Sequence, residues 1–82
     1  MTWADWIKKQ LQDRGLFESD AEKILEAIKS APENAAMATR WNDSTDNYPP
    51  QMQSVVWLSV KSIAFEWIDE NQPNAWYKSM FA

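Results

Sequence analysis

Apolar residues between Pro50 and Asn71 recur with the period of an α-helix. One stripe of such a helix holds Met52, Val56, Val60, Ile63 and Trp67, and the neighbouring arc holds Trp57, Leu58, Ala64, Phe65 and Ile68. The strip left for water holds Gln51, Val55, Ser59, Ser62, Glu66 and Asp69. A helix that is apolar over most of its circumference is either the central element of a bundle or covered by a partner. The pattern predicts one long, largely buried helix over residues 50–70.

The segment Ser54–Val60 also has the composition of a buried strand, because it is rich in β-branched and aromatic residues. The apolar pattern around it, however, continues without a break between two proline-marked ends. That is far longer than a typical strand of about five or six residues. The length of the pattern therefore favours the helix.

Helical spacing also appears at the start of the chain, where Thr2 can cap a first helix and Asp5 complements its dipole. The apolar positions that follow are Trp3, Trp6, Ile7 and Leu11. Gly15 is the only glycine and is typical of a helix stop. These signals predict a helix from Trp3 to Arg14, after which Leu16 and Phe17 are expected to enter the core.

Two S-x-x-E patterns, at Ser19 and Ser30, are typical of capping boxes. The first predicts a second helix from Asp20 to Lys29, with an apolar stripe made of Ala21, Ile24, Leu25 and Ile28. The second, with Pro32 in the first turn, predicts a short third helix of small residues that continues to Trp41.

A polar loop from Asn42 to Pro49 follows, and we expect Trp41 and Tyr48 to pin it to the body of the protein. Asn71 can adopt the left-handed conformation that ends the long helix. The segment from Pro73 to Phe81 can add a short fifth helix. Together these elements predict an all-α fold, a compact bundle of four to five helices that forms a single domain over residues 1–82.

Composition narrows the function classes. With 12 acidic and 8 basic residues the net charge is −4, which argues against direct binding of nucleic acid or of an anionic membrane. The longest apolar run, Val55–Leu58, is far too short to span a membrane, and the first ten residues lack a signal peptide pattern. The absence of cysteine suits a reducing compartment. We therefore expect a cytoplasmic protein.

The residues that usually carry catalysis are scarce. The chain has neither His nor Cys, and the Ser59, Lys61 and Ser62 combination has no glycine-rich turn to supply an oxyanion hole. The cluster Glu66, Asp69 and Glu70 lacks the histidines of a carboxylate-bridged metal helix. The loop at 42–47 lacks the central Gly and terminal Glu of a calcium loop. We expect no enzyme, no cofactor and no metal site.

Negative charge is concentrated in the middle of the chain. From Glu18 to Asp46 there are seven acidic residues against three basic ones, and Glu22 and Glu26 repel each other one helical turn apart. Such a face either keeps a tryptophan-rich protein soluble or meets a basic patch on a partner. In the second case the expected partner-binding residues are Glu18, Glu22, Glu26, Asp43 and Asp46.

Aromatic residues offer another contact surface. Trp57 and Trp76 are either covered by the C-terminal helix or displayed as interface anchors, since tryptophan is enriched at interfaces. The candidate residues for a partner or oligomer contact are Trp57, Phe65, Ile68, Trp76, Tyr77 and Phe81. This excess of apolar surface predicts a homodimer or a tightly docked C-terminal helix.

The leading hypothesis is therefore a small acidic protein-binding module. We expect an accessory or inhibitory protein, of the type found in phages and mobile elements, that engages a basic site on a larger protein. Such a site can be one that binds nucleic acid. The alternative is a homo-oligomeric structural protein with no external target, and an enzyme is the most remote alternative.

Overall fold

The described part of the chain folds into three α-helices and two short 3-10 helices. The computed structural model describes residues 1–31 and 40–82. In chain order the elements are α1 (Trp3–Asp13), α2 (Glu18–Ser30), η2 (Thr45–Asn47), α4 (Pro50–Asn71) and η3 (Trp76–Phe81). Strand-like pairing within these residues is limited to one isolated bridge between Thr2 and Ser44. The predicted all-α class is confirmed. Most of the predicted third helix falls at 32–39 and lies outside the described residues.

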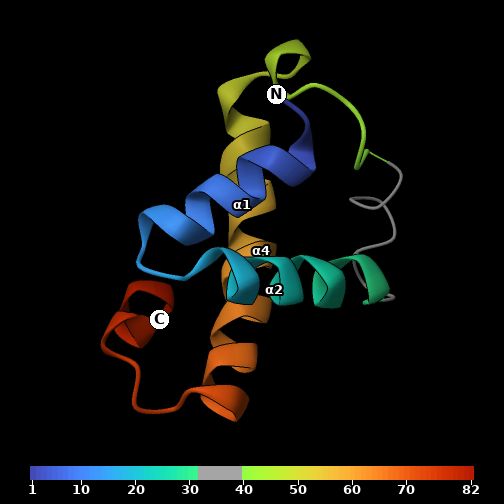
Figure 1. The fold of residues 1–82 in the computed structure, drawn as a ribbon. Helices are drawn as coiled ribbons and strands as arrows, with labels where there is room; N and C mark the ends of the chain where they lie inside the picture. Colours follow the sequence, from blue (N-terminus) through green and yellow to red (C-terminus); the bar gives the residue numbers. More distant parts are fainter. Residues whose placement is uncertain (32–39) are drawn as a thin grey trace.

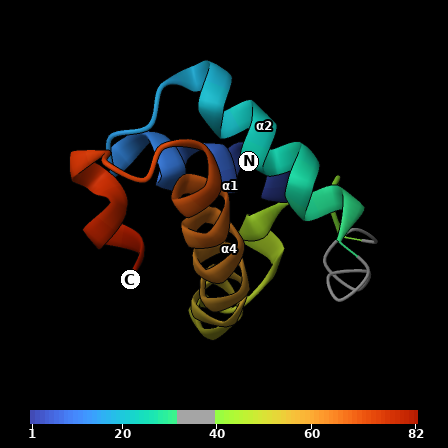
Figure 2. The ribbon, with the colours of Figure 1, turned by 90° about the horizontal axis from the view of Figure 1, so that it is seen from below.

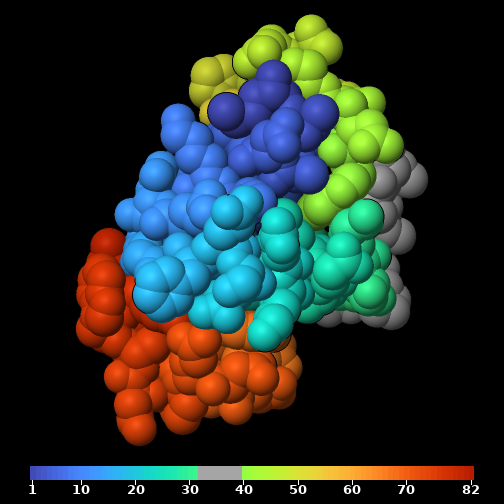
Figure 3. Space-filling model, in the orientation of Figure 1, coloured from blue at the N-terminus to red at the C-terminus, as the bar shows by residue number. Residues whose placement is uncertain are grey.

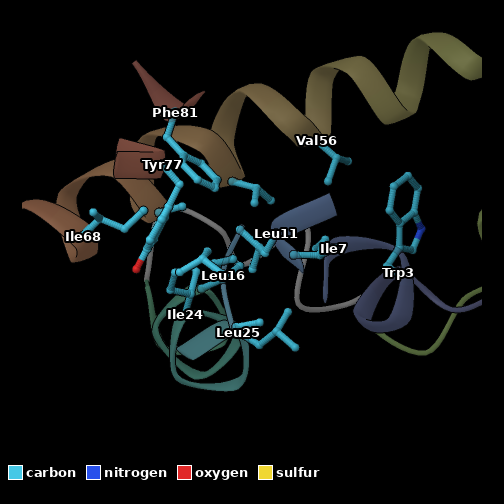
Figure 4. Close-up of a cluster of buried hydrophobic side chains, with 14 residues drawn as sticks. Trp3, Ile7, Leu11, Leu16, Ile24, Leu25, Val56, Ile68, Tyr77 and Phe81 are labelled. Carbon is cyan, nitrogen blue, oxygen red and sulfur yellow. The ribbon is translucent and has the colours of Figure 1, made fainter. Parts of the chain in front are cut away.

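The helices form two layers. Figure 1 shows α1 and α2 lying across the long α4, and Figure 2 shows both on the same side of it, with η3 beside its C-terminal half. Side chains from all four elements meet between the layers, and Figure 4 shows Trp3 at one end of this core and Tyr77 and Phe81 at the other. The fully buried large side chains are Trp3, Phe81, Ile7, Leu11, Ile24, Ile28, Ile68 and Val60.

The first helix follows its sequence signals closely. The Thr2 hydroxyl accepts a hydrogen bond from the Asp5 backbone N–H at 3.3 Å and donates one to the Asp5 carboxylate at 2.9 Å. The helix ends at Asp13, one residue earlier than predicted, with Arg14 as its C-cap. Gly15 then has a φ of 116°, a conformation that side chains with a Cβ rarely adopt. The predicted helix stop is confirmed.

The second helix begins differently from the prediction. It starts at Glu18 with Phe17 as the N-cap, so Ser19 lies inside the first turn and the predicted Ser19 capping box is wrong. Phe17 is also 78% exposed, whereas Leu16 is buried as expected. The backbone at Phe17 is extended, and consecutive side chains of an extended chain point to opposite sides. Because Leu16 points into the core, Phe17 points into solvent.

The other end of this helix also differs slightly. Ser30 is the last residue of α2 and Ala31 is its C-cap, so the helix runs one residue beyond the predicted Lys29. The rest of the second predicted capping box, at Pro32 and Glu33, lies outside the described residues.

The long helix α4 confirms the helical interpretation of 50–70 and excludes the strand alternative for Ser54–Val60. Its buried positions are Val56, Val60, Ala64 and Ile68, while Met52, Ile63 and Trp67 of the predicted central stripe are only half buried. The buried stripe is therefore rotated slightly about the helix axis relative to the predicted stripe. The helix is central, but only one of its faces is buried.

The end of α4 does not use the predicted left-handed Asn71. No residue other than glycine has a positive φ in the described ranges, and Asn71 is still helical. Its side-chain amide instead donates to the Trp67 carbonyl at 2.8 Å, and Gln72 is the C-cap. The amide thus satisfies a terminal carbonyl of the helix, which is the task that the left-handed cap would have performed.

The C-terminal segment is docked on the body, which is one of the two predicted outcomes. It forms a 3-10 helix of six residues, η3, and buries Tyr77 and Phe81. Gln72 connects it to α2, because the Gln72 amide donates to the Asp20 carboxylate at 2.8 Å and the Tyr77 hydroxyl donates to the Gln72 amide oxygen. This connection gives the buried carboxylate of Asp20 a hydrogen-bond partner.

Candidate functional site

The outward side of α2 carries the predicted acidic residues in one row. Because Ala21, Ile24 and Ile28 face the core, Glu18, Glu22 and Glu26 face solvent, and all three are exposed. Residues four apart on a helix are about 6 Å apart along its axis. We call this row of three carboxylates the α2 face.

A lysine from α1 already holds two of these carboxylates. The Lys8 ammonium lies 2.7 Å from Glu18 and 3.1 Å from Glu22. Its hydrogen bond lowers the pKa of the Glu18 carboxyl, and the hydrogen bonds to Glu18 and Glu22 raise the pKa of Lys8. The repulsion between Glu22 and Glu26 that the sequence suggested is therefore partly relieved inside the protein.

The two aspartates of the polar loop serve local structure. Asp43 accepts a hydrogen bond from the Tyr48 hydroxyl at 2.8 Å, which raises the pKa of Tyr48. Asp46 lies 3.4 Å from the N-terminal ammonium and accepts from the Ser44 hydroxyl at 3.2 Å. Both side chains are exposed, but both are engaged.

The loop itself is pinned as predicted. Its two bounding aromatic residues, Trp41 and Tyr48, pack against the core, and the Tyr48 ring lies 5.9 Å from the ring of Trp3. The backbone also contributes, since the Trp3 N–H donates to the Asp43 carbonyl at 3.1 Å and the Thr45 N–H donates to the Met1 carbonyl at 2.8 Å. These contacts hold the loop against the start of α1.

An open cleft of about 550 Å³ lies beside the α2 face. Figure 3 shows its surroundings, where the start of α1, the residues just after 40 and α2 meet on one side of the molecule. Its lining residues are Ala4, Ser19, Glu22, Lys23, Leu25, Glu26, Lys29 and Trp41. The Lys29 ammonium lies 5.3 Å from the centre of the Trp41 ring, within range of a cation–π interaction. We call this hollow the Trp41 cleft.

Most of the residues predicted to form an aromatic contact surface are not exposed. Ile68, Tyr77 and Phe81 are buried in the core of the same chain. Phe65 is half buried, with the Lys78 ammonium 5.4 Å from the centre of its ring. These four residues therefore stabilise the docked C-terminal segment.

Trp57 and Trp76 have different environments. Trp57 is half buried between the Arg14 guanidinium, 4.0 Å from its ring centre, and the ring of Phe81 at 6.0 Å. Trp76 is 76% exposed and lies over Gly15, so closely that a Cβ at that position would come within 2.8 Å of its ring. Trp76 is thus the one tryptophan of the predicted set that is displayed.

Three features of the site could not be found by reading the sequence in segments. The role of Lys8 depends on how α1 and α2 cross, and the Trp41 cleft depends on the position of the loop. The third feature is the exposure of Phe17, a residue that the sequence analysis places in the core. A weak signal existed only for Phe17, because the two apolar residues between Gly15 and the next helix cannot both face inward on an extended backbone.

Within residues 1–31 and 40–82, no group of three or more His, Cys, Asp or Glu side chains is arranged to hold a metal ion. The helices of the same ranges include none with the length and apolar character needed to cross a membrane. Comparison of the chain with protein-family models, with curated proteins and with solved structures found no match.

Proposed function

We propose that this domain is a protein-binding module without catalytic activity, which docks the α2 face and the Trp41 cleft on a basic site of a larger protein. In this role it is an accessory or inhibitory protein of the type found in phages and mobile elements. Basic sites often bind nucleic acid, so a module that occupies one competes with nucleic acid for it.

The observation that carries the proposal is that this side of the protein already holds cations in two places. Lys8 is held by Glu18 and Glu22 at 2.7 and 3.1 Å, and Lys29 lies over Trp41. Both are ways in which a lysine or arginine of a partner is bound at interfaces. The intramolecular pairs are therefore examples of the chemistry proposed for the partner.

The lining of the Trp41 cleft suits a long basic side chain. Leu25 and Ala4 line the cleft and can contact an aliphatic stem, while Glu22 and Glu26 also line it and can pair with the charged head. An incoming arginine can stack on Trp41 if Lys29 moves aside, and guanidinium groups stack well on aromatic rings. The cleft thus favours arginine on the partner.

The net charge of the whole domain also favours a basic partner. A net charge of −4 attracts a basic surface before contact, which raises the rate of association more than the final affinity. Within the α2 face, Glu26 has no ion-pair partner among the described residues, so its charge is available to a partner.

The proposal is tested by charge reversal. The double variant Glu22→Lys and Glu26→Lys changes the charge of the α2 face without touching the core. A matched control is Glu66→Lys with Glu70→Lys, because these two exposed carboxylates have the same spacing on α4 and the same effect on net charge. Each protein is immobilised, exposed to a lysate of its native host, and its captured proteins are compared by mass spectrometry.

We expect one protein to be captured by the wild type and by the α4 control but lost with the α2 variant. Its association rate, measured with the purified partner at low salt, should then fall at least about tenfold in the α2 variant. A partner that both variants capture equally well would place the interface elsewhere, with the exposed Phe17 and Trp76 as the next candidates.

A further inference from the structure

The indole of Trp76 is exposed and yet held in position. The side chain is 76% exposed, but its ring lies against Gly15, the only glycine of the chain. The ring of Tyr77 meets it in a T-shaped arrangement, with 5.8 Å between the ring centres. A large side chain that is already fixed loses little conformational entropy when a partner covers it. Trp76 is therefore preorganised for a contact.

Several other aromatic rings of this protein hold a cation of the same chain. An arginine or lysine lies between 4.0 and 5.4 Å from the ring centres of Trp41, Tyr48, Trp57 and Phe65. Such pairs occur about once in 70–80 residues, so this short chain uses them unusually often. Trp76, the most exposed of the tryptophans, has no such cation among the described residues. Its ring can make the same contact with a cation from a partner.

The electrostatic surroundings of Trp76 favour a cation over an apolar side chain. The indole lies at Gly15, just beyond the C-terminal end of α1, where the helix dipole attracts positive charge. Asp13, the last residue of α1, is exposed and has no ion-pair partner among the described residues. An apolar side chain that covered this helix end would desolvate the carboxylate without pairing it, which is costly. A guanidinium can stack on the indole and donate to the carboxylate at once.

The basic side chains closest to Trp76 in the chain are engaged elsewhere. The Arg14 guanidinium lies over the ring of Trp57 at 4.0 Å, and the Lys78 ammonium lies 2.6 Å from the Asp69 carboxylate. Neither side chain is paired with the indole of Trp76. The exposed surface of this ring is therefore free for a partner.

Trp76 also lies close to the α2 face. Three residues of chain lead from Gly15, against which the indole packs, to Glu18, and they span at most about 11 Å. Figure 3 shows η3, in red, beside the light-blue turn that leads into α2. A stable interface covers about 800 Å² of each partner, which is far wider than this distance. A protein docked on the α2 face therefore reaches Trp76 as well.

We propose that Trp76 binds an arginine side chain of the basic partner, with the guanidinium stacked on the indole and its N–H groups directed at Asp13. This inference rests on the proposed function and adds a second contact to the same interface. The carboxylates of the α2 face attract the partner before contact, whereas Trp76 acts in the formed complex, where tryptophans contribute strongly to affinity. Arginine is favoured over lysine because its planar, weakly hydrated head stacks on aromatic rings.

Peptides of equal charge test the proposal. Octa-arginine and octa-lysine are titrated into the wild-type chain at about 50 mM NaCl, and the dissociation constants are measured by calorimetry. We expect Trp76→Leu to weaken octa-arginine binding at least about threefold and octa-lysine binding less, since only the guanidinium stacks well. Trp76→Phe keeps a ring and should lose less. Met80→Ala removes another exposed apolar side chain of η3 and should change neither constant.

The same titrations separate this inference from the proposed function. The double variant Glu22→Lys and Glu26→Lys should weaken both peptides, because it acts through charge alone. If that variant weakens binding and Trp76→Leu does not, the arginine contact is overturned and the α2 face stands. If only Trp76→Leu weakens octa-arginine binding, the arginine contact stands and the α2 face is wrong.

A direct readout is the indole N–H signal of Trp76 in the NMR spectrum, which is assigned by its loss in Trp76→Phe. We expect octa-arginine to shift this signal more than octa-lysine does, with the Met80→Ala variant behaving as the wild type. An indole signal that stays unchanged at saturating octa-arginine, or equal losses of both peptides in Trp76→Leu, overturns the proposal. A wild-type chain that does not bind octa-arginine at about 1 mM overturns it too.

Discussion

At the scale of single residues, Gly15 has two roles of which the sequence indicates one. As the only glycine after a helical pattern it predicts a helix end, and its φ of 116° agrees. The sequence does not indicate that Trp76, far along the chain, lies over it and occupies the space of a Cβ. That contact depends on how η3 docks, which no local pattern determines.

The two roles of Gly15 can be separated by substitution. We expect Gly15→Ala to lower the free energy of unfolding by at least about 1 kcal/mol, because alanine strains the backbone and meets the indole of Trp76. Combining it with Trp76→Ala should restore part of that loss, since the steric contact is then removed. Urea unfolding of the two single variants and the double variant measures this coupling. Strictly additive effects would show that the indole does not constrain Gly15.

Phe17 is an exposed N-cap with no side-chain hydrogen bond to the helix. Phe17→Ser should therefore raise the free energy of unfolding by about 0.5–1 kcal/mol, because serine caps the free N–H groups of the first turn and almost no packing is lost. Phe17→Ala, which cannot cap, is the control and should change little. A loss of more than about 1 kcal/mol in both variants would indicate that Phe17 packs on the protein after all.

The ion pair of Lys8 and Glu18 predicts a specific dependence on pH. The hydrogen bond from Lys8 lowers the pKa of Glu18 in the folded protein, so the pair stabilises the fold above the ordinary carboxyl range and this stabilisation is lost as the pH falls through the lowered pKa. Lys8→Met should return the pKa of Glu18 to its ordinary value. A carboxyl titration followed by NMR checks this, and an unchanged pKa in the variant would rule out the pair in solution.

At the scale of elements, the sequence predicts which segments are helical better than it predicts how their ends are built. The apolar periods of α1, α2 and α4 are long and give bounds within one or two residues of those observed. The ends depend on single hydrogen bonds for which several residues compete. Ser19 was a plausible cap, but Phe17 takes that position because Leu16 is anchored in the core.

The sequence predicts that either a docked C-terminal segment or a second copy of the chain covers α4, and it does not decide between the two. The stability of the docked element η3 should depend on Tyr77, whose ring is buried and whose hydroxyl donates to Gln72. We expect Tyr77→Phe to lower the free energy of unfolding by about 1 kcal/mol and Tyr77→Ala by about 3–5 kcal/mol. Met80→Ala, at an exposed position of the same element, should change it by less than about 0.5 kcal/mol. Equal effects of Tyr77→Ala and Met80→Ala would show that η3 is not docked in solution.

At the scale of the whole molecule, the candidate site was predictable as a set of charges but not as a surface. Their spacing of four residues places Glu18, Glu22 and Glu26 on one side of a helix. Only the packing of α1 against α2 brings Lys8 to two of them, and only the pinned loop places Trp41 in the cleft that the third also lines. Such contacts join residues that are distant in sequence, and periodicity carries no information about them.

Binding through the α2 face should depend on salt. The proposed contact is an attraction between unlike charges, so added salt should slow association of the wild-type chain with its basic partner. The double variant Glu22→Lys and Glu26→Lys should show a weaker dependence on salt, because two of the attracting charges are reversed. Association rates measured from about 20 to 500 mM NaCl give both slopes. Equal slopes for the two proteins would show that the α2 face does not contribute to the attraction.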